Sequence, residues 1–390
     1  MGEAVLEAYT RALREVGNPA STHGHGQRAL EALEAARERI ALGIGCEAAE
    51  VVLTTGGTES INLALKGAYW GRQRGAARPV LLVADGEHHA TIEAAEWLRD
   101  TQGAELVWLP LDATGRVTPE VLRAAITAAG AERVALVSFL WANNEIGTVQ
   151  PVAALCEVAR AHGIPTHVDA VAALGQVRID ARAAGADFLS VSAHKIGGPV
   201  GVGALVVGRR ARIEPLFHGG SQQRGRSGTQ DVAGAVAFAA ALDEALVAGG
   251  NDPQPAHVAR MAELRDRLVA GVRRIDPSAV LRGAGGGADG AGGGSGGRLP
   301  GNAHFTFPGC QGDSLVYLLD AAGVSVSVGS ACRAGVAETS HVLLALRIPE
   351  AEAAGALRFT LGTASADWEI DALLAELPGA LERARAAGLS

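Results

Sequence analysis

From residue 51 onward the chain alternates short apolar strands with helical stretches, and this alternation restricts the folds open to it. We expect strands over residues 51–55, 80–84, 134–140, 166–169, 187–192 and 202–207. Helical patterns follow several of them, ending near Tyr69 and Leu98 and spanning Val152–Ala161. Apolar, β-branched strands separated by helices indicate a mostly parallel sheet that is buried on both faces. The predicted fold class is therefore α/β.

The composition changes after about residue 247, which predicts a second domain. A cluster of helix-breaking residues covers 249–255, and 283–297 is mostly glycine, which is typical of a surface loop. We therefore expect a large domain over 1–247 and a smaller C-terminal α/β domain over 248–390. The smaller domain should contain strands over 303–307, 324–328 and 357–361 and helices over 257–274, 313–322, 341–346 and 368–385.

Polar side chains recur where the expected strands of the large domain end. The residues in question are Thr58, His88, Asn144, Asp169, His194 and Lys195. In open α/β sheets, ligands bind at the carboxyl ends of the strands. The sequence therefore predicts one functional site at this edge of the sheet.

Lys195 is the most specific of these residues. Only two of the 34 basic side chains are lysines, Lys66 and Lys195, and arginine fills every other basic position. Arginine cannot lose its proton and attack a carbonyl, whereas lysine can. We predict that Lys195 forms a Schiff base, and that the end of a buried strand desolvates its amine and lowers the pKa. Lys66 lies within a helical pattern, and we expect it to be structural.

A Schiff-base lysine requires a carbonyl cofactor, and the neighbouring motifs fit pyridoxal 5'-phosphate. This cofactor needs a phosphate site, a carboxylate at its ring nitrogen and a group that packs on the ring. The Gly-Gly-Thr sequence at 56–58 should open a helix whose free N–H groups bind an anion. Asp169 ends the strand before the lysine strand, and His88 follows another strand. Together these features predict a pyridoxal phosphate site.

Two residues of the smaller domain are candidates for substrate chemistry. Alternation in the strand 357–361 places Arg358 on the face opposite the leucine and phenylalanine side chains, where its guanidinium could bind a carboxylate. Cys332 lies among Gly, Ser, Ala and Arg, a setting that favours an accessible thiolate. We predict that Cys332 is a nucleophile. Cys156, on the apolar side of a helix, is expected in the core.

Charge and cysteine content exclude several classes of protein. The net charge is −8 without a basic block, which argues against nucleic acid as a partner. The N-terminus has no secretory pattern and no apolar run reaches membrane-spanning length. The four cysteines show no Cys-x-x-Cys spacing, so neither a metal site nor a disulfide framework is expected. These features predict a cytoplasmic enzyme that does not bind a membrane.

The chain resembles the cysteine desulfurases of the NifS/IscS type, which are pyridoxal-phosphate enzymes of aminotransferase class V. The resemblance runs from Glu3 to the end of the chain. It rests on Gly17-Asn-Pro-Ala-Ser, Thr55-Gly-Gly-Thr-Glu-Ser, Glu87-His88, Asn143-Asn144-Glu145-Ile-Gly, His167-Val-Asp169-Ala, Ser192-Ala-His194-Lys195, Arg226-Ser-Gly-Thr229, Gly329-Ser-Ala-Cys332 and Leu357-Arg358-Phe359. It implies an aminotransferase-like fold of type I and a homodimer.

The resemblance also implies a role for each site residue. Lys195, Cys332 and His88 would be catalytic, with His88 stacked on the cofactor ring and Asp169 at the ring nitrogen. The phosphate ligands would be Gly57, Thr58, Ser192, His194 and, from the other subunit, Thr229. Asn144 and Arg358 would bind the carboxylate of L-cysteine. The implied reaction yields alanine and a persulfide on Cys332, whose sulfur passes to an acceptor such as an iron–sulfur scaffold protein or a sulfurtransferase.

The chain departs from the family pattern in three places, and two alternatives stay open. The chain begins beyond the family's Ala-Thr-Thr-Pro segment, Ala172 replaces a glutamine, and Gln223 replaces a glutamate. One alternative is a selenocysteine lyase or another class V pyridoxal phosphate enzyme. The other is a catalytically impaired scaffold that binds sulfur-transfer partners. The pathway also stays open among iron–sulfur cluster assembly, thio-modified tRNA and a specialised biosynthesis.

Overall fold

A computed structural model describes residues 1–285, 297–329 and 339–387 of the chain. The chain divides into two compact units. Unit 1 consists of Met1–Leu109, Thr118–Trp141 and Pro151–Gln254, and unit 2 of Pro110–Val117, Ala142–Gln150 and Pro255–Ser390. The residues that were expected to bind the cofactor lie in unit 1, whereas Asn144 and Arg358 lie in unit 2.

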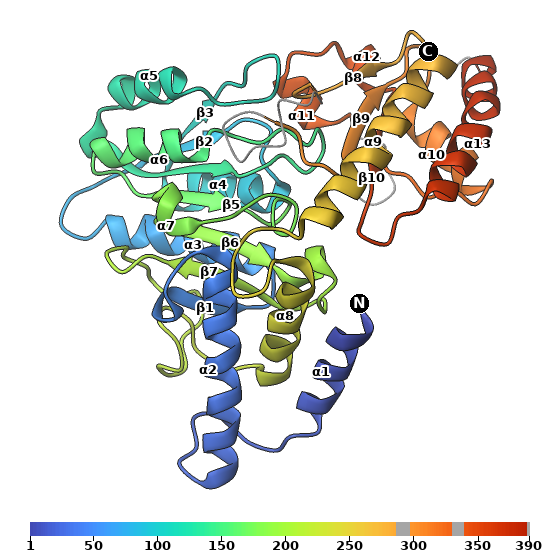
Figure 1. Ribbon diagram of the computed structural model, residues 1–390. Helices are drawn as coiled ribbons and strands as arrows, with labels where there is room; N and C mark the ends of the chain where they lie inside the picture. The colour runs from blue at the N-terminus through green and yellow to red at the C-terminus, as the bar shows by residue number, and fades with distance from the viewer. Residues whose placement is uncertain (286–296, 330–338, 388–390) are drawn as a thin grey trace. The chain divides into compact units, whose positions relative to one another are not determined.

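Unit 1 is built on a seven-stranded sheet (Figure 1). Its order is β1 (Val51–Thr54), β7 (Gly203–Val207), β6 (Phe188–Ser192), β5 (Thr166–Asp169), β4 (Val134–Leu140), β2 (Val80–Ala84) and β3 (Glu105–Leu109). Strands β6, β5, β4, β2 and β3 pair in parallel, and only β7 pairs antiparallel with both of its neighbours. The predicted mostly parallel α/β fold is confirmed.

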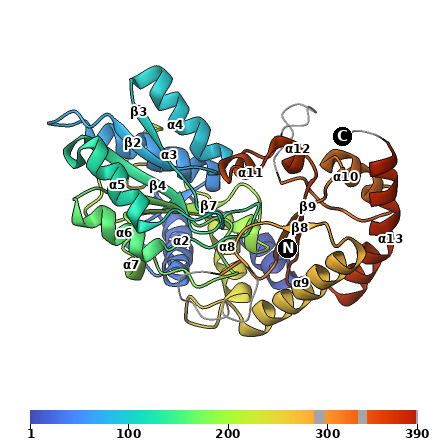
Figure 2. The ribbon, with the colours of Figure 1, turned by 90° about the horizontal axis from the view of Figure 1, so that it is seen from above.

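Helices cover both faces of this sheet (Figure 2). Helices α3 (Gly57–Arg72) and α4 (His89–Gln102) pack on one face, and α5 (Pro119–Ala129), α6 (Val152–Ala161) and α7 (Ala181–Ala184) on the other. The division follows from right-handed crossovers, because the chain moves along the sheet in one direction up to β3 and in the other from β3 to β6. All residues of β1, β2 and β4 to β7 are buried as a result.

Three further helices of unit 1 pack together. They are α1 (Glu3–Leu13), α2 (Gly24–Ile44) and α8 (Val232–Ala245), and a small core of Val5, Ala237 and Ala241 lies between α1 and α8. Short 3-10 helices cover η1 (Ala48–Glu50), η2 (Ala131–Arg133) and η3 (Ala193–Ile196). Among the described residues, no helix is long and apolar enough to cross a membrane.

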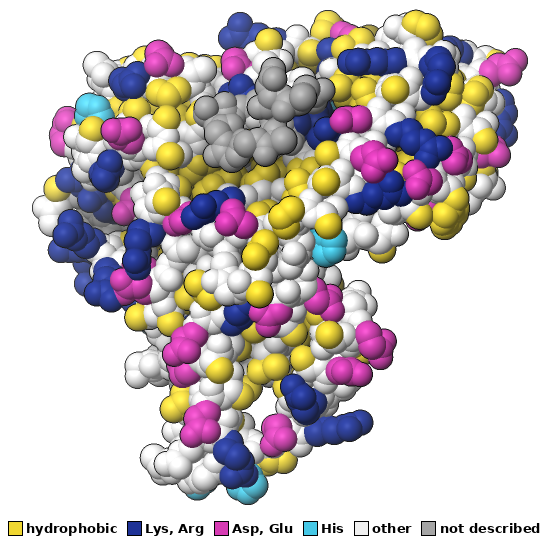
Figure 3. Space-filling view, in the orientation of Figure 1, with side chains coloured by type: hydrophobic (Ala, Val, Ile, Leu, Met, Phe, Trp, Pro, Cys, Tyr) yellow, Lys and Arg dark blue, Asp and Glu magenta, His cyan; other side chains and the backbone are white. Residues whose placement is uncertain are grey.

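Unit 2 contains a three-stranded antiparallel sheet in the order β10 (Ala356–Thr360), β9 (Asn302–Thr306) and β8 (Val280–Leu281). Its helices are α9 (Pro255–Ile275), α10 (Gly312–Asp320), α11 (His341–Ala345), α12 (Glu350–Ala353) and α13 (Asp367–Ala386). Its hydrophobic core includes Phe305, Phe307 and Phe359, and the ring of Phe305 packs against the other two. Basic and acidic side chains alternate over α9 and α13 (Figure 3), where Arg267 pairs with Asp367.

Two expectations for unit 2 need comment. The predicted strand over 324–328 is wrong, because only Ser327 forms a bridge, to Arg358, while the N–H of Val324 instead donates to Leu319 at the end of α10. Residues 286–296 of the expected glycine-rich loop lie outside the described part of the chain.

Candidate active site

A pocket opens where β1 passes into α3, and it gathers four of the predicted site residues. Gly56 connects the two elements with φ at +139°, a conformation that favours glycine. The pocket has a volume of about 240 Å³ and is lined by Thr55, Gly56, Gly57, Thr58, Glu59, Ser192, His194, Val200 and Gly201. We call it the α3 pocket. The free N–H groups and the dipole of the helix start favour an anion there.

Two contacts explain why the α3 pocket needs these residue types. A Cβ atom on Gly57 would lie 2.8 Å from Cγ2 of Val171, so a larger residue would push α3 away from the segment that follows β5. The hydroxyl of Ser192 lies 2.8 Å from Nδ1 of His194, which fixes the imidazole ring at the pocket. Both side chains follow directly from the end of β6.

Two carboxyl groups are fully buried beside one another at the ends of the strands. Asp169 ends β5, and its Oδ1 accepts a hydrogen bond of 2.9 Å from the N–H of Val171. Burial raises the pKa of Asp169 to about 6, although the Val171 N–H and the charge of Lys195 lower it. Glu87 accepts a 2.7 Å hydrogen bond from the N–H of Leu140, and burial together with Asp169 raises its pKa well above the usual range. The site therefore favours a cationic partner for Asp169.

Lys195 lies in η3, three residues beyond the end of β6, and its side chain is exposed. The expectation that the strand end desolvates this amine is therefore wrong for the chain alone. The reason is that β6 ends at Ser192, and η3 turns the following side chains toward the surface. Lys195 still acts electrostatically on Asp169, so the two predicted partners belong to the same site.

His88 is the N-cap residue of α4 and is exposed. Its Nδ1 accepts a hydrogen bond of 3.1 Å from the N–H of Ala90, so the neutral ring carries its proton on Nε2. This bond fixes the orientation of the ring at the carboxyl end of β2. His88 is thus held in place by its own helix.

In unit 2, Arg358 and Asn144 are in contact. Nη1 of Arg358 donates to the backbone carbonyl of Asn144 at 3.2 Å, and Nη2 lies 3.4 Å from Oγ of Ser327. Nε of Arg358 is buried and has no hydrogen-bond partner among the described residues. A guanidinium with an unused buried donor is suited to bind a carboxylate.

The sequence reasoning missed Glu145, which organises this part of unit 2. Its carboxylate accepts a 2.5 Å hydrogen bond from Ser340, and a Cβ on Gly329 would lie 2.8 Å from the same oxygen, Oε2. Burial raises the pKa of Glu145, whereas Ser340, His341 and Arg358 act to lower it. Glu145 therefore contacts residues on both sides of the sequence 330–338. A glutamate directly after Asn143-Asn144 was the available signal.

The remaining predicted residues are placed as follows. Cys332 lies outside the described part of the chain. Thr229 is exposed and does not line the α3 pocket of its own chain. Cys156 is buried, as expected, and burial raises the pKa of its thiol to about 12. Among the described residues, no group of three or more His, Cys, Asp or Glu side chains could hold a metal ion.

The buried carboxyl of Asp169 predicts a pH dependence of stability in the cofactor-free protein. Because its pKa is raised to about 6 on folding, the neutral form stabilises the native state at low pH, and this contribution is lost as the pH rises through 6. Asp169→Asn should remove it. We expect the variant to gain stability relative to wild type between pH 5 and pH 7.5, by about 1–3 kcal/mol. Urea unfolding of both proteins at pH 5 and pH 7.5 measures their free energies of unfolding. If the difference between variant and wild type were the same at both pH values, the prediction would be wrong.

Comparisons with known proteins agree on the family. The Aminotransferase class-V family model matches residues 2–373. An IscS-like cysteine desulfurase of Mycobacterium tuberculosis is 45% identical, covering 100% of this chain and 96% of the relative. A cysteine desulfurase IscS of Dictyoglomus turgidum is 37% identical, covering 98% and 92%.

Solved structures agree with this result. A NifS-like protein superposes with a TM-score of 0.84 at 31% identity, covering 98% of this chain and 96% of that chain. A structure described as SspA in complex with cysteine gives a TM-score of 0.76 at 29% identity, covering 94% and 97%. Both similarities extend over nearly the full chain, so they include both units.

Proposed function

The chain belongs to the cysteine desulfurases of aminotransferase class V, and from this premise we propose that it uses pyridoxal 5'-phosphate to remove sulfur from L-cysteine. The products are L-alanine and a persulfide on Cys332, from which an acceptor protein takes the sulfur. The observation that carries the proposal is the grouping of the α3 pocket, the buried Asp169 and Lys195 at one edge of the sheet in unit 1.

The residues of unit 1 fit this cofactor. The α3 pocket offers backbone N–H groups and the side chains of Thr58, Ser192 and His194 to a phosphate. Burial destabilises the ionised form of Asp169 when no strong cation pairs with it, so this carboxylate suits the protonated ring nitrogen. When bound, the cofactor supplies an acceptor for the electron pair that remains on the substrate when its α-proton leaves.

The chain's own side chains then have separate roles. Nζ of Lys195 would hold the cofactor in the resting enzyme, and its free amine would accept the α-proton of the substrate. The Asp169 carboxylate would hold the protonated ring nitrogen and keep that proton in place. His88, whose Nδ1 accepts a hydrogen bond from the Ala90 N–H, would pack on the ring and donate from Nε2.

The sulfur step takes place on Cys332. Its thiolate attacks the sulfur of L-cysteine, so that an S–S bond forms while the bond between that sulfur and the substrate Cβ breaks. The electron pair stays with the carbon skeleton, which takes up a proton and leaves as alanine. The formation of alanine and of the persulfide therefore requires no external oxidant or reductant.

Arg358 and Asn144 select the substrate by its carboxylate. Nε of Arg358 supports this role, because it is buried and has no hydrogen-bond partner within the part of the chain that the structure describes. Arg358→Lys should keep the charge but lose the planar fork that binds a carboxylate through two N–H groups. We expect KM for L-cysteine to rise by about 10- to 100-fold, with a smaller change in kcat. Steady-state alanine production measures both; an unchanged KM would exclude Arg358 as the carboxylate ligand.

We further propose a homodimer in which Thr229 reaches the phosphate held by the other subunit. The exposure of Thr229 outside its own α3 pocket is compatible with this arrangement. The acceptor of the persulfide sulfur is a second protein, either an iron–sulfur scaffold or a sulfurtransferase. The cytoplasmic location expected from the sequence stays a prediction.

One experiment tests the proposed function. Purified protein loaded with pyridoxal phosphate should convert L-cysteine to alanine, with one sulfur released per alanine in the presence of a thiol reductant. Failure to form alanine, although the cofactor is bound, would favour the catalytically impaired scaffold. Turnover of L-selenocysteine without turnover of L-cysteine would identify a selenocysteine lyase.

A further inference from the structure

A carboxylate lines the α3 pocket, although we propose that the pocket holds a dianionic phosphate. Glu59 lies in the first turn of α3, and its side chain is only 9% exposed. Oε2 accepts hydrogen bonds of 2.7 Å from both the N–H and the hydroxyl of Thr55. Burial alone would raise the pKa of Glu59, but the hydrogen bonds of Arg226 and Thr55 lower it below the usual value. The pocket thus contains a fixed negative charge that would repel phosphate.

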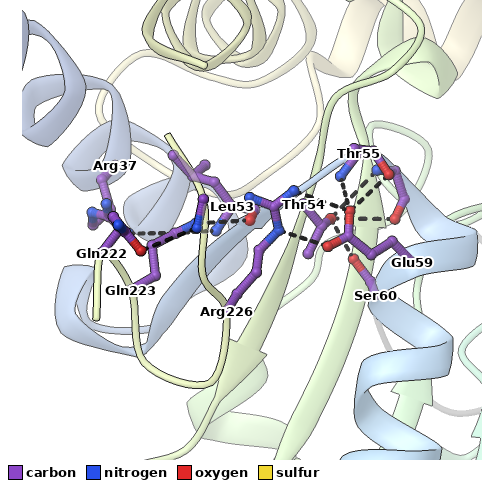
Figure 4. Close-up of polar contacts among 11 residues, drawn as sticks. Arg37, Leu53, Thr54, Thr55, Glu59, Ser60, Gln222, Gln223 and Arg226 are labelled. Atoms are coloured by element: carbon purple, nitrogen blue, oxygen red, sulfur yellow. Dashed lines mark hydrogen bonds and ion pairs between the residues drawn. The ribbon is translucent and has the colours of Figure 1, made fainter. Parts of the chain in front are cut away.

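Arg226 compensates this charge from outside the pocket (Figure 4). Its Nε donates to Oε1 of Glu59 at 2.6 Å, and its Nη2 lies 3.4 Å from Oε2. The Arg226 side chain is only 16% exposed, so solvent screens the pair less than it screens a surface ion pair. Arg226 does not itself line the pocket.

The turn that carries Arg226 is attached to the edge strand β1. The N–H of Gln223 donates to the Arg226 carbonyl at 3.2 Å and closes the turn, and Gly225 within it has φ at +73°. The side chain of Gln223 accepts from the N–H of Leu53 at 2.7 Å and donates to its carbonyl at 3.0 Å. A glutamate could not make the second bond, because a carboxylate has no donor. Gln223 therefore fixes the turn beside the start of α3.

We propose that Arg226 is a positioning residue for the cofactor phosphate: it neutralises Glu59, so that the α3 pocket binds a dianion, while Gln223 holds its turn on β1. This inference rests on the proposed function and adds to it a pair of residues, 167 positions apart, that sets the affinity for phosphate. Through the contact between Arg226 and Glu59, the segment that precedes Thr229 is also held beside the α3 pocket.

The proposal is tested by comparing pyridoxal phosphate with pyridoxal, which lacks the phosphate. Arg226→Gln should weaken the binding of pyridoxal phosphate by about tenfold and leave the affinity for pyridoxal unchanged. Inorganic phosphate should compete less well in this variant. Glu59→Gln should bind pyridoxal phosphate at least as tightly as wild type, and the double variant Glu59→Gln/Arg226→Gln should recover to within about threefold of wild type. Equilibrium titrations by absorbance and fluorescence measure these constants.

Arg133→Gln is the matched control. It removes the same type of charge from an ion pair with Glu105, whose side chains are 46% and 52% exposed, at the opposite edge of the sheet. We expect no change in either affinity. Arg226→Lys keeps the charge and should retain most of the preference for pyridoxal phosphate over pyridoxal. This variant keeps the proposal testable if Arg226→Gln fails to fold.

Three results would overturn the inference. The first is an equal loss of affinity for pyridoxal and pyridoxal phosphate in Arg226→Gln, and the second is no loss of affinity for either. The third is a double variant that binds pyridoxal phosphate as weakly as Arg226→Gln alone. In each case wild type would still prefer pyridoxal phosphate, and the proposed function would stand. If wild type itself showed no preference for pyridoxal phosphate over pyridoxal, the α3 pocket would not be a phosphate site, and the cofactor assignment would fail with the inference.

Discussion

Lys195→Ala is expected to abolish covalent cofactor binding and to lower alanine production by at least about 10³-fold. The amine of Lys195 is the nucleophile proposed to hold the cofactor and the base proposed to accept the α-proton, and the charge of Lys195 acts on the pKa of Asp169. Lys195→Arg should show the same loss, because arginine keeps the positive charge beside Asp169 but cannot give up its proton. Borohydride treatment followed by mass spectrometry of the peptides measures the attachment.

The chain provides its own control for this prediction, because it has only one other lysine. Nζ of Lys66 lies 4.3 Å from the centre of the Trp97 ring, a cation–π contact that arginine can also make. Lys66→Arg should therefore bind the cofactor and react as wild type does. Cofactor attached to the peptide of Lys66, or retained covalently by Lys195→Arg, would contradict the assignment.

The sheet of unit 1 could be predicted largely because its strands are buried on both faces. A strand such as β4 then reads as an uninterrupted apolar run, and the helix over Val152–Ala161 was placed at its observed bounds. Strand β3 was missed because only Leu109 is fully buried and the others alternate in exposure, as suits an edge strand. The antiparallel course of β7 depends on pairing with β1, far away in the sequence, which no local pattern reports.

The site could be predicted where its residues follow strands, and could not where they depend on distant partners. His194 was identified because strand ends converge at one edge of the sheet, whereas Ser192 came from the resemblance to the family. Arg226 follows no strand, and the roles of Arg226 and Glu145 depend on partners more than a hundred residues away, Glu59 and Ser340 respectively. The desolvation expected for Lys195 was wrong because a short turn intervenes between β6 and this residue.

Segments 110–117 and 142–150 belong to unit 2, although they lie in the first half of the chain. A change in composition along the sequence cannot reveal such a crossing, because each segment is short and is flanked by strands and helices of unit 1. The consequence is functional: Asn144 and Glu145 are part of the unit that contains Arg358. The substrate ligands proposed here thus share one unit, whereas the cofactor ligands share the other.

The second large effect is expected at Cys332, which separates sulfur transfer from other pyridoxal phosphate chemistry. Cys332→Ala should still bind the cofactor and still change its visible spectrum on addition of L-cysteine, because neither event uses the Cys332 thiol. Alanine production should fall by at least about 10³-fold, since the attacking sulfur is gone. Cys332→Ser should fail in the same way, because a hydroxyl is a far weaker nucleophile toward sulfur than a thiolate.

The persulfide itself provides the decisive measurement. Mass spectrometry of wild-type protein after a single turnover should show one additional sulfur on the peptide that contains Cys332, and none on this peptide in either variant. Cys156→Ala is the control: its thiol is buried with a pKa raised to about 12, so its removal should change stability and not the rate of alanine formation. If Cys332→Ala formed alanine from L-cysteine at the wild-type rate, a protein persulfide would not be an intermediate. A selenocysteine lyase would then be the better assignment, because its reaction releases alanine and can proceed without a sulfur acceptor on the protein.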